Sequence, residues 1–294
     1  MNEQVELSRY TTLGTGGPAR WFDTPESEEA LVERLAWAER EGLEVAVVGL
    51  GSNLLVADDG FPGLVLKLAG DLAKAEAADG RLVAGGGATL AVCLHRARAA
   101  ELGELEFACA IPGTVGGGVW MNAGAYGSDI ARVLDRALVA EAGRTRWLTP
   151  DELGLRYRSS GLRHGQVVAR AEFRLAPRPA DEIKAKVAEM QGRRKAAQPT
   201  NKRTFGSVFK NPEHELTAGR MLEACGLRGF RSGGAQISPK HANFIENADG
   251  ARSADAIALV AEARRRAREQ FGVVLHPEVQ LLGALEVPPL DPSG

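Results

Sequence analysis

The sequence has few cysteines, few aromatic residues and no long apolar run. Its three cysteines, Cys93, Cys109 and Cys225, are odd in number and lack C-x-x-C spacing, so they favour neither a disulfide framework nor a zinc site. The apolar stretch at residues 45–50 is far shorter than the ~20 residues that a membrane-spanning helix needs. The N-terminus has no apolar signal segment. We therefore expect a cytoplasmic protein without membrane association or a metal site.

Neither sign of charge dominates the composition. The 36 basic and 38 acidic side chains give a net charge of −2, whereas proteins that bind nucleic acid usually have a clear basic excess. The basic run at residues 264–268 is flanked by Glu262 and Glu269, which is typical of the solvated face of a helix. We therefore expect no nucleic-acid partner.

Glycine is abundant and unevenly distributed. Sixteen of the 35 glycines lie between Gly49 and Gly127, in clusters at residues 49–51, 85–87 and 113–118. The segment 14–19 matches G-x-G-x-x-A but lacks a preceding strand, Leu54 replaces the third glycine after Gly49, and no P-loop motif occurs. The remaining interpretations are plain tight turns or a cradle of backbone N–H groups for a phosphate; for one cluster alone the two are about equal. Two clusters together favour a ligand.

The hydrophobic pattern predicts a mixture of helices and strands. Helices are expected at 27–41, 89–102, 181–197, 217–225 and 253–271. Strands are expected at 44–48, 54–57, 64–68, 81–84, 133–140, 145–148, 166–175, 235–237, 243–246 and 273–282. The pattern breaks at Ala176-Pro-Arg-Pro179, so we place a domain boundary between residues 178 and 179.

Several motifs, in this order, resemble those of the UDP-N-acetylenolpyruvoylglucosamine reductase family. The N-terminal signature of that family is similar to residues 12–20, its two FAD-binding segments to 49–56 and 111–127, and its substrate-site arginine motif to Tyr157-Arg-Ser-Ser160. The C-terminal half adds Phe205-Gly-Ser-Val-Phe-Lys-Asn-Pro212, Gln236-Ile-Ser-Pro-Lys-His-Ala-Asn-Phe244 and His276-Pro-Glu-Val279. The resemblance covers nearly the whole chain.

The resemblance implies an α+β fold. It predicts an FAD-binding α/β region of the vanillyl-alcohol oxidase type, with two subdomains, over residues 1–178, and a smaller α/β substrate-binding domain over 179–294. The short interval between Tyr157 and Phe205 is similar to the compact type II form of the family, and we expect a monomer. Two positions depart from the family pattern, Ala110 and Ala197. The second departure leaves open whether Arg193, Arg194, Lys195 or Lys210 meets the substrate diphosphate.

The same resemblance implies a two-step reaction with non-covalent FAD and NADPH. NADPH reduces the flavin, which then delivers hydride to C3 of the enolpyruvyl ether, leaving negative charge on C2 and its carboxylate. An arginine is always protonated and binds carboxylates bidentately, so Arg158 is expected to hold that carboxylate. Ser207 is expected to donate a proton to C2; Lys210 or water could reload it. Glu278 is expected to be protonated in the complex and to donate a hydrogen bond.

The resemblance also assigns binding residues. The expected FAD ligands are Gly49, Gly51, Ser52, Asn53, Leu54, Gly113, Thr114, Gly116, Gly117, Asn122, Ala123 and Gly124. The expected substrate ligands are Tyr157, Lys210, Asn211, Gln236, His241 and Asn243. For the last two, a purely structural role is about equally plausible.

Three alternatives stay open at this point. One is a flavin oxidase of the same superfamily with another substrate, and another is a binding protein without turnover. Cys109 could also attach flavin covalently, although a free cysteine is more often a small buried apolar residue. The preference for NADPH over NADH is not fixed by the sequence.

Overall fold

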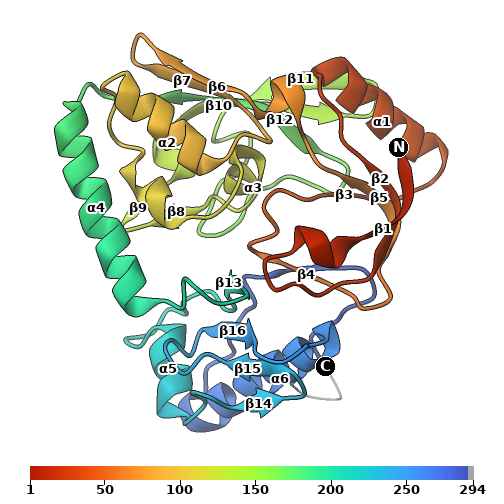
Figure 1. The fold of residues 1–294 in the computed structure, drawn as a ribbon, viewed down its shortest axis with the longest axis vertical. Helices are drawn as coiled ribbons and strands as arrows, with labels where there is room; N and C mark the ends of the chain where they lie inside the picture. The colour runs from red at the N-terminus through yellow and green to blue at the C-terminus, as the bar shows by residue number, and fades with distance from the viewer. Residues whose placement is uncertain (291–294) are drawn as a thin grey trace. The chain divides into compact units, whose positions relative to one another are not determined.

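The computed structural model describes residues 1–290, which form strands and helices in a mixed order (Figure 1). The α-helices are α1 (Glu28–Arg40), α2 (Leu90–Ala99), α3 (Val115–Trp120), α4 (Ala180–Ala197), α5 (Ala218–Ala224) and α6 (Ser253–Phe271). The strands are β1 (Asn2–Glu6), β2 (Pro18–Asp23), β3 (Val45–Val47), β4 (Leu54–Val56), β5 (Phe61–Leu66), β6 (Ala75–Ala78), β7 (Arg81–Gly85), β8 (Gly124–Ala125), β9 (Ser128–Asp129), β10 (Leu134–Glu141), β11 (Arg144–Leu148), β12 (Val167–Arg174), β13 (Thr204–Ser207), β14 (Arg231–Ser232), β15 (Ala235–Ile237), β16 (Phe244–Asn247) and β17 (Gln280–Leu282). Short 3₁₀ helices lie at Leu7–Tyr10, Gly70–Ala73, Glu106–Ala110 and Ile130–Arg132.

The strands form three larger sheets and two short pairs. The larger sheets have the orders β1-β2-β5-β3, β11-β10-β12-β7-β6 and β13-β16-β15-β14. The second is antiparallel throughout, whereas β3 and β5 pair in parallel, with Val45 opposite Leu64. The pair β17-β4 is parallel and β8-β9 is antiparallel. No helix within residues 1–290 is long and apolar enough to cross a membrane.

Two compact units follow from the density of contacts along the chain. The first unit comprises residues 1–3, 21–50 and 63–194; the second comprises 4–20, 51–62 and the chain from Lys195 onward. The boundary expected at residues 178 and 179 differs from this division, because α4 continues the first unit. Ile183 of α4 is fully buried in the core of that unit, and Lys186 and Arg178 pair with the buried Glu106. The assignment of functional domains to 1–178 and 179–294 stays a proposal.

The first unit is built on both faces of its five-stranded sheet. Alternate residues of β10 point to opposite sides, so that Ala137 and Val139 pack with residues of α2 and α3, whereas Leu138 and Ala140 pack with residues of α1 and β5 (Figure 1). Burial on both sides explains why residues 137–140 of β10 and 167–169 of β12 are continuously apolar. The two apolar layers give the glycine-rich segments a rigid support.

The second unit has a single apolar core. Helix α6 packs on β14 and β15 and on α5 (Figure 1). Its apolar residues, such as Leu259 and Val260, contact the core that includes Phe205, Ile237 and Ile245. Helix α6 ends at Gly272, whose φ of 68° is the left-handed conformation that glycine favours at a helix end.

Most predicted elements are confirmed, and one long strand is wrong. Helix α6 has the predicted bounds, and the hairpin β10–β11 and helices α1, α2, α4 and α5 lie where the sequence places them. Of the strand expected at 273–282, only Gln280–Leu282 forms. Pro277 has no N–H for a ladder, and its neighbourhood makes only an isolated bridge with Phe209. Strands β1, β2, β6, β8, β9, β13 and β14 were not predicted.

Candidate active site

In the first unit, Gly49, at the start of the first predicted FAD segment, lies against Thr114 of the second. A Cβ added at Gly49 would lie 2.6 Å from the Thr114 hydroxyl oxygen, so only glycine allows this approach. Gly49, Thr114, Gly86 and Gly87 line one pocket together with Val47, Val48, Lys67 and Leu68. Residues of all three glycine clusters, at 49–51, 85–87 and 113–118, thus meet at this pocket.

The glycine cluster at 113–118 contains the start of a helix, which corrects the expectation of tight glycine turns. Residues 115–120 form α3, and the Thr114 hydroxyl caps it by accepting a hydrogen bond from the N–H of Gly117 at 3.4 Å. Gly116 is needed for packing, since its N–H donates to the carbonyl of Gly86 at 2.7 Å and an added Cβ would lie 3.0 Å from that oxygen. Gly113 and Gly117 differ, because the nearest atoms to an added Cβ are 3.9 Å and 3.6 Å away.

Lys67 lines the pocket but was not predicted from the sequence. It follows β5, and its Nζ donates a hydrogen bond to the carbonyl of Gly49 at 3.1 Å. Among residues 1–290 no carboxylate lies within ion-pair distance of it. The only sequence signal is a lysine that ends an apolar strand, and this signal is weak because such residues are usually solvated.

Arg158 lies in a tight turn of the first unit. Backbone hydrogen bonds join Arg156 and Ser159 in both directions, at 3.0 and 3.2 Å, and Arg158 has a φ of 52°. Its Nη2 donates to the carbonyl of Gly124 at 2.5 Å, and its guanidinium carbon lies 5.1 Å from the centre of the Tyr157 ring. The predicted arginine is therefore bonded directly to the second predicted FAD segment.

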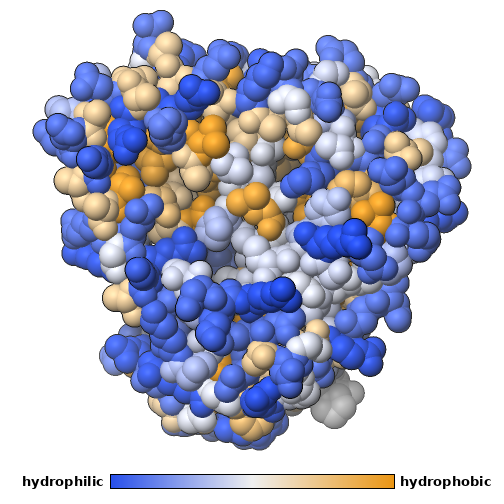
Figure 2. Space-filling view, viewed as in Figure 1, coloured by the Kyte–Doolittle hydropathy of each residue, from blue (hydrophilic) through white to orange (hydrophobic). Residues whose placement is uncertain are grey.

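The surroundings of this turn expose aromatic side chains. Figure 2 shows a mostly hydrophilic face with several apolar patches. Tyr157 is 54% exposed and Tyr126 is 40% exposed, and the Tyr126 hydroxyl donates to the carbonyl of Met190 at 2.6 Å. Tyr157 is therefore accessible to a ligand, as the sequence prediction requires.

Asn122, Ala123 and Gly124 link α3 to the hairpin β8–β9. Asn122 is only 3% exposed, and both polar ends of its side chain are hydrogen-bonded within the unit. The N–H of Ala123 donates to the carbonyl of Gly118 at 2.8 Å. A Cβ at Gly124 would lie 2.4 Å from the Ser128 carbonyl, so this position needs glycine for the hairpin.

In the second unit, three predicted motifs converge. Gly206, with a φ of 83°, brings its own Cα close to the Ser52 carbonyl, and an added Cβ would lie 3.0 Å from that oxygen. The Asn53 amide donates to the carbonyl of Glu278 at 3.1 Å. The N–H of Glu278 donates to the carbonyl of Val208, the residue after Ser207, at 2.7 Å. The structure thus joins Ser52–Leu54, Gly206–Ser207 and Glu278.

The remaining predicted substrate ligands of this unit have separate roles in the fold. Lys210 is half-buried, and its N–H donates to the carbonyl of His276 at 3.0 Å. Asn211 accepts a hydrogen bond from the N–H of Ala218 at 3.1 Å, at the start of α5. The Gln236 amide donates to the carbonyl of Gly229 at 3.1 Å.

Asn243 and His241 make hydrogen bonds to the protein backbone. The Asn243 side chain contacts both the N–H and the carbonyl of Phe209, each at 2.9 Å. The His241 Nδ1 accepts from the N–H of Asn243 at 3.2 Å, and burial lowers the pKa of this imidazole. These contacts fit the structural role that the sequence left open. The Asn243 side chain holds the backbone of Phe209, the residue before Lys210.

The basic residues of α4 differ in their surroundings. Arg193 pairs with Glu189 at 2.6 Å, whereas Arg194 is half-buried, and burial lowers the pKa of its guanidinium. Cys109 is half-buried, burial raises the pKa of its thiol, and its Sγ lies 4.0 Å from the carbonyl of Val187. In the described part of the chain no cluster of three or more metal-ligating side chains occurs.

Comparison with known proteins gives the family. One family model, described as an FAD binding domain, matches residues 19–149. A second, described as the C-terminal domain of UDP-N-acetylenolpyruvoylglucosamine reductase, matches residues 198–282.

Close relatives extend over nearly the whole chain. A protein of Symbiobacterium thermophilum named UDP-N-acetylenolpyruvoylglucosamine reductase 2 is 44% identical, with 94% of this chain and 90% of the relative covered. A protein of Rubrobacter xylanophilus with the name UDP-N-acetylenolpyruvoylglucosamine reductase is 42% identical, with 94% and 93% covered. The crystal structure of the reductase from Thermus caldophilus superposes with a TM-score of 0.83 at 38% identity, covering 96% of this chain and 98% of that one.

Proposed function

The chain belongs to the UDP-N-acetylenolpyruvoylglucosamine reductase family, and from this membership we propose that it reduces the enolpyruvyl group of UDP-N-acetylenolpyruvoylglucosamine with NADPH. It is an FAD-dependent oxidoreductase with the expected α+β fold. The proposed product is UDP-N-acetylmuramate, a precursor of peptidoglycan. One observation carries the proposed chemistry: Ser207, Glu278 and Asn53, from three distant motifs, lie on segments that are directly hydrogen-bonded or adjacent within one unit.

The glycines of the first unit fit a bound dinucleotide. Gly113 and Gly117 have negative φ, and a Cβ at either would meet no tight contact within the protein. Neither the backbone conformation nor the packing therefore requires glycine there, whereas close approach of a ligand to the backbone does. Lys67 supplies a cation beside this cradle without a carboxylate partner in the part of the chain described above, which suits an anionic group such as a diphosphate.

FAD, when bound, supplies the hydride for C3 of the enolpyruvyl group. The protein has to stabilise the negative charge that develops on C2 and its carboxylate. In our proposal Arg158 binds the carboxylate and stabilises that charge, because a guanidinium stays protonated and offers paired N–H donors. The bond from Arg158 to Gly124 holds the cation in place before the substrate arrives, which reduces the reorganisation needed in the transition state.

Ser207 is proposed to deliver the proton to C2. A serine hydroxyl is a weak acid, but an enolate is a strong enough base to accept its proton. Within residues 1–290 the Ser207 hydroxyl has no hydrogen-bond partner, so it is available to a substrate. Gly206 adopts a left-handed backbone conformation, which sets the direction of the chain at the following residue, Ser207. The proposed role of Glu278 is to donate a hydrogen bond, in its protonated form, to the substrate carboxylate.

The other partners in this proposal are small molecules. Tyr157 and Lys210 are proposed to contact the nucleotide-linked sugar, since one is an accessible aromatic ring and the other a half-buried cation. We propose that the protein acts as a monomer in the cytoplasm, where both NADPH and nucleotide sugars are available. NADPH is proposed to compete with the substrate for binding, so that excess substrate inhibits its oxidation competitively.

Product analysis tests this function directly. The purified FAD-loaded protein is mixed with NADPH and UDP-N-acetylenolpyruvoylglucosamine, and UDP-N-acetylmuramate is measured by mass spectrometry. One mole of product is expected for each mole of NADPH consumed. Consumption of oxygen with formation of hydrogen peroxide, and no reduced sugar nucleotide, would instead identify a flavin oxidase.

A further inference from the structure

Asn122 has a more specific place in the structure than its motif suggests. It follows α3, is nearly fully buried, and adopts a φ of 39°, which asparagine tolerates better than most residues. Its Nδ2 donates to the carbonyl of Arg156 at 3.0 Å, and its Oδ1 accepts from the N–H of Ala131 at 2.9 Å. The side chain is therefore committed to holding other parts of the protein.

One of those parts is the turn that carries Arg158. The carbonyl of Arg156, which accepts from Asn122, also accepts from the N–H of Ser159 and so closes the turn. The other end of the turn is fixed by the bond from the Arg158 guanidinium to Gly124, two residues after Asn122. The segment 122–124 thus makes two hydrogen bonds to the turn, one to the carbonyl of Arg156 and one from the guanidinium of Arg158.

Few apolar side chains hold this turn. Arg156 and Tyr157 are exposed, and Arg158 has the left-handed backbone conformation, which is strained for a non-glycine residue. The nearest preceding apolar residue that packs on the core of this unit is Leu155. With few apolar contacts to hold a strained backbone, the hydrogen bonds to Asn122 and Gly124 contribute to where the guanidinium lies.

We propose that Asn122 is a positioning residue for Arg158, which sets the guanidinium for the substrate carboxylate by holding the carbonyl of Arg156. This inference rests on the proposed function, in which Arg158 binds that carboxylate. It separates Asn122 from the cofactor ligands: its side chain serves the half-reaction with the sugar nucleotide, and the half-reaction with NADPH does not depend on it.

The Asn122→Asp variant tests the proposal with little change of shape. The aspartate keeps an acceptor for Ala131 and tolerates the backbone conformation, but it loses the donor to Arg156. Asn122→Gly removes both bonds without adding charge. Asn247→Asp is the matched control, since the Asn247 side chain also bridges two backbone groups, Leu13 at 3.0 Å and Ala251 at 2.9 Å.

Both half-reactions are measured by anaerobic stopped-flow on the FAD-loaded proteins, and binding of UDP-N-acetylmuramate to the flavin-free proteins by calorimetry. Asn122→Asp and Asn122→Gly are expected to slow reoxidation of the flavin by the enolpyruvyl substrate at least tenfold and to weaken product binding at least fivefold. Reduction by NADPH should stay within twofold, as should every value for Asn247→Asp. An equal loss in both half-reactions, or no loss in either, would overturn the proposal.

A double-mutant comparison separates this inference from the function on which it rests. In an Arg158→Ala background, Asn122→Asp should slow reoxidation by less than twofold further, because the group that it positions is gone. A full additional tenfold loss would show that Asn122 acts by another route. If Arg158→Ala alone left reoxidation unchanged, the proposed role of Arg158 would fail instead.

Discussion

At the scale of single residues, the glycines fall into two physically different groups. Some, such as Gly49 and Gly124, are required because a Cβ would collide with neighbouring protein atoms. Gly117 lies on the exposed side of α3 with open space at its Cβ position, and glycine there costs helix stability relative to alanine. Its presence therefore fits a requirement for ligand approach.

This distinction predicts opposite effects of one substitution. Gly117→Ala should stabilise the flavin-free protein by about 0.5–1 kcal/mol, because alanine is the better helix former, while it weakens FAD binding at least tenfold. Gly192→Ala is the matched control, since Gly192 is an exposed glycine of α4 with nothing within 4 Å of its Cβ position. It should give the same stabilisation with unchanged FAD affinity. Urea unfolding measures the stability, and flavin fluorescence titration measures the FAD affinity. Wild-type FAD affinity in Gly117→Ala would contradict the proposal that FAD approaches the backbone at Gly117.

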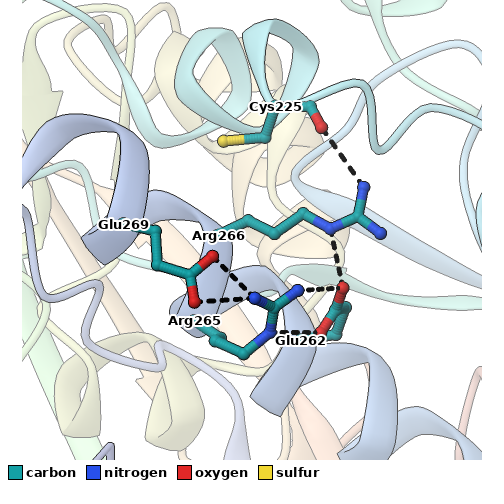
Figure 3. A network of polar contacts seen from close by, with 5 residues as sticks. All are labelled: Cys225, Glu262, Arg265, Arg266 and Glu269. Carbon is teal, nitrogen blue, oxygen red and sulfur yellow. Dashed lines mark hydrogen bonds and ion pairs between the residues drawn. The ribbon is translucent and has the colours of Figure 1, made fainter.

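At the scale of elements, α6 carries a charged network that ties it to the end of α5 (Figure 3). Arg265 bonds both Glu262 and Glu269, and Arg266 bonds Glu262 at 2.6 Å and the carbonyl of Cys225 at 3.4 Å. The hydrogen bond from Arg265, with that from Arg266, lowers the pKa of Glu262 to about 2. Two arginines of the basic run, Arg265 and Arg266, are therefore paired with carboxylates of the same helix.

The network predicts a pH-dependent contribution to stability. Because the folded-state pKa of Glu262 is depressed, its contribution is present above its ordinary pKa of 4.5 and is lost as the pH falls towards 2. Glu262→Gln should lower the free energy of unfolding by about 0.5–1 kcal/mol at pH 7, the range of partly exposed ion pairs, and by less at pH 4. Glu269→Gln, which removes a contact to Arg265 only, should have a smaller effect. A difference that grows between pH 7 and pH 4 in urea unfolding would contradict this assignment.

The elements also show what the sequence could and could not predict. Helix α6 was predictable to the residue because a regular apolar stripe ends at Gly272, and the β10–β11 hairpin because two strand-like runs flank a glycine turn. The strand at 273–282 was over-predicted because its apolar content was weighed above Pro277, which has no N–H for a strand ladder. Lys67 was not predicted as a site residue, and Asn122 was predicted only as an FAD ligand, because the hydrogen bonds that each makes depend on which backbone carbonyls the fold brings within reach.

At the scale of the whole molecule, bound FAD should stabilise the fold by mass action. A ligand at about 100 times its Kd adds about 2.7 kcal/mol to the stability of the protein state that binds it. The unfolding temperature of the flavin-free protein is therefore expected to rise continuously as FAD is added, and less in Gly117→Ala than in Gly192→Ala at equal FAD. Scanning calorimetry measures this; an unfolding temperature that is independent of FAD concentration would contradict the assignment of the glycine-rich segments.

The central claim is that Ser207 protonates C2 of an enolpyruvyl sugar nucleotide in a flavin-dependent reduction. The measurement that tests it most directly is anaerobic stopped-flow: the protein is reduced with NADPH and mixed with UDP-N-acetylenolpyruvoylglucosamine, for the wild type and Ser207→Ala. We predict rapid reoxidation of the wild-type flavin, and at least a thousandfold slower reoxidation in Ser207→Ala, with substrate affinity and NADPH reduction within about threefold of wild type. Wild-type rates of reoxidation in Ser207→Ala would contradict the account, as would a flavin that only oxygen reoxidises.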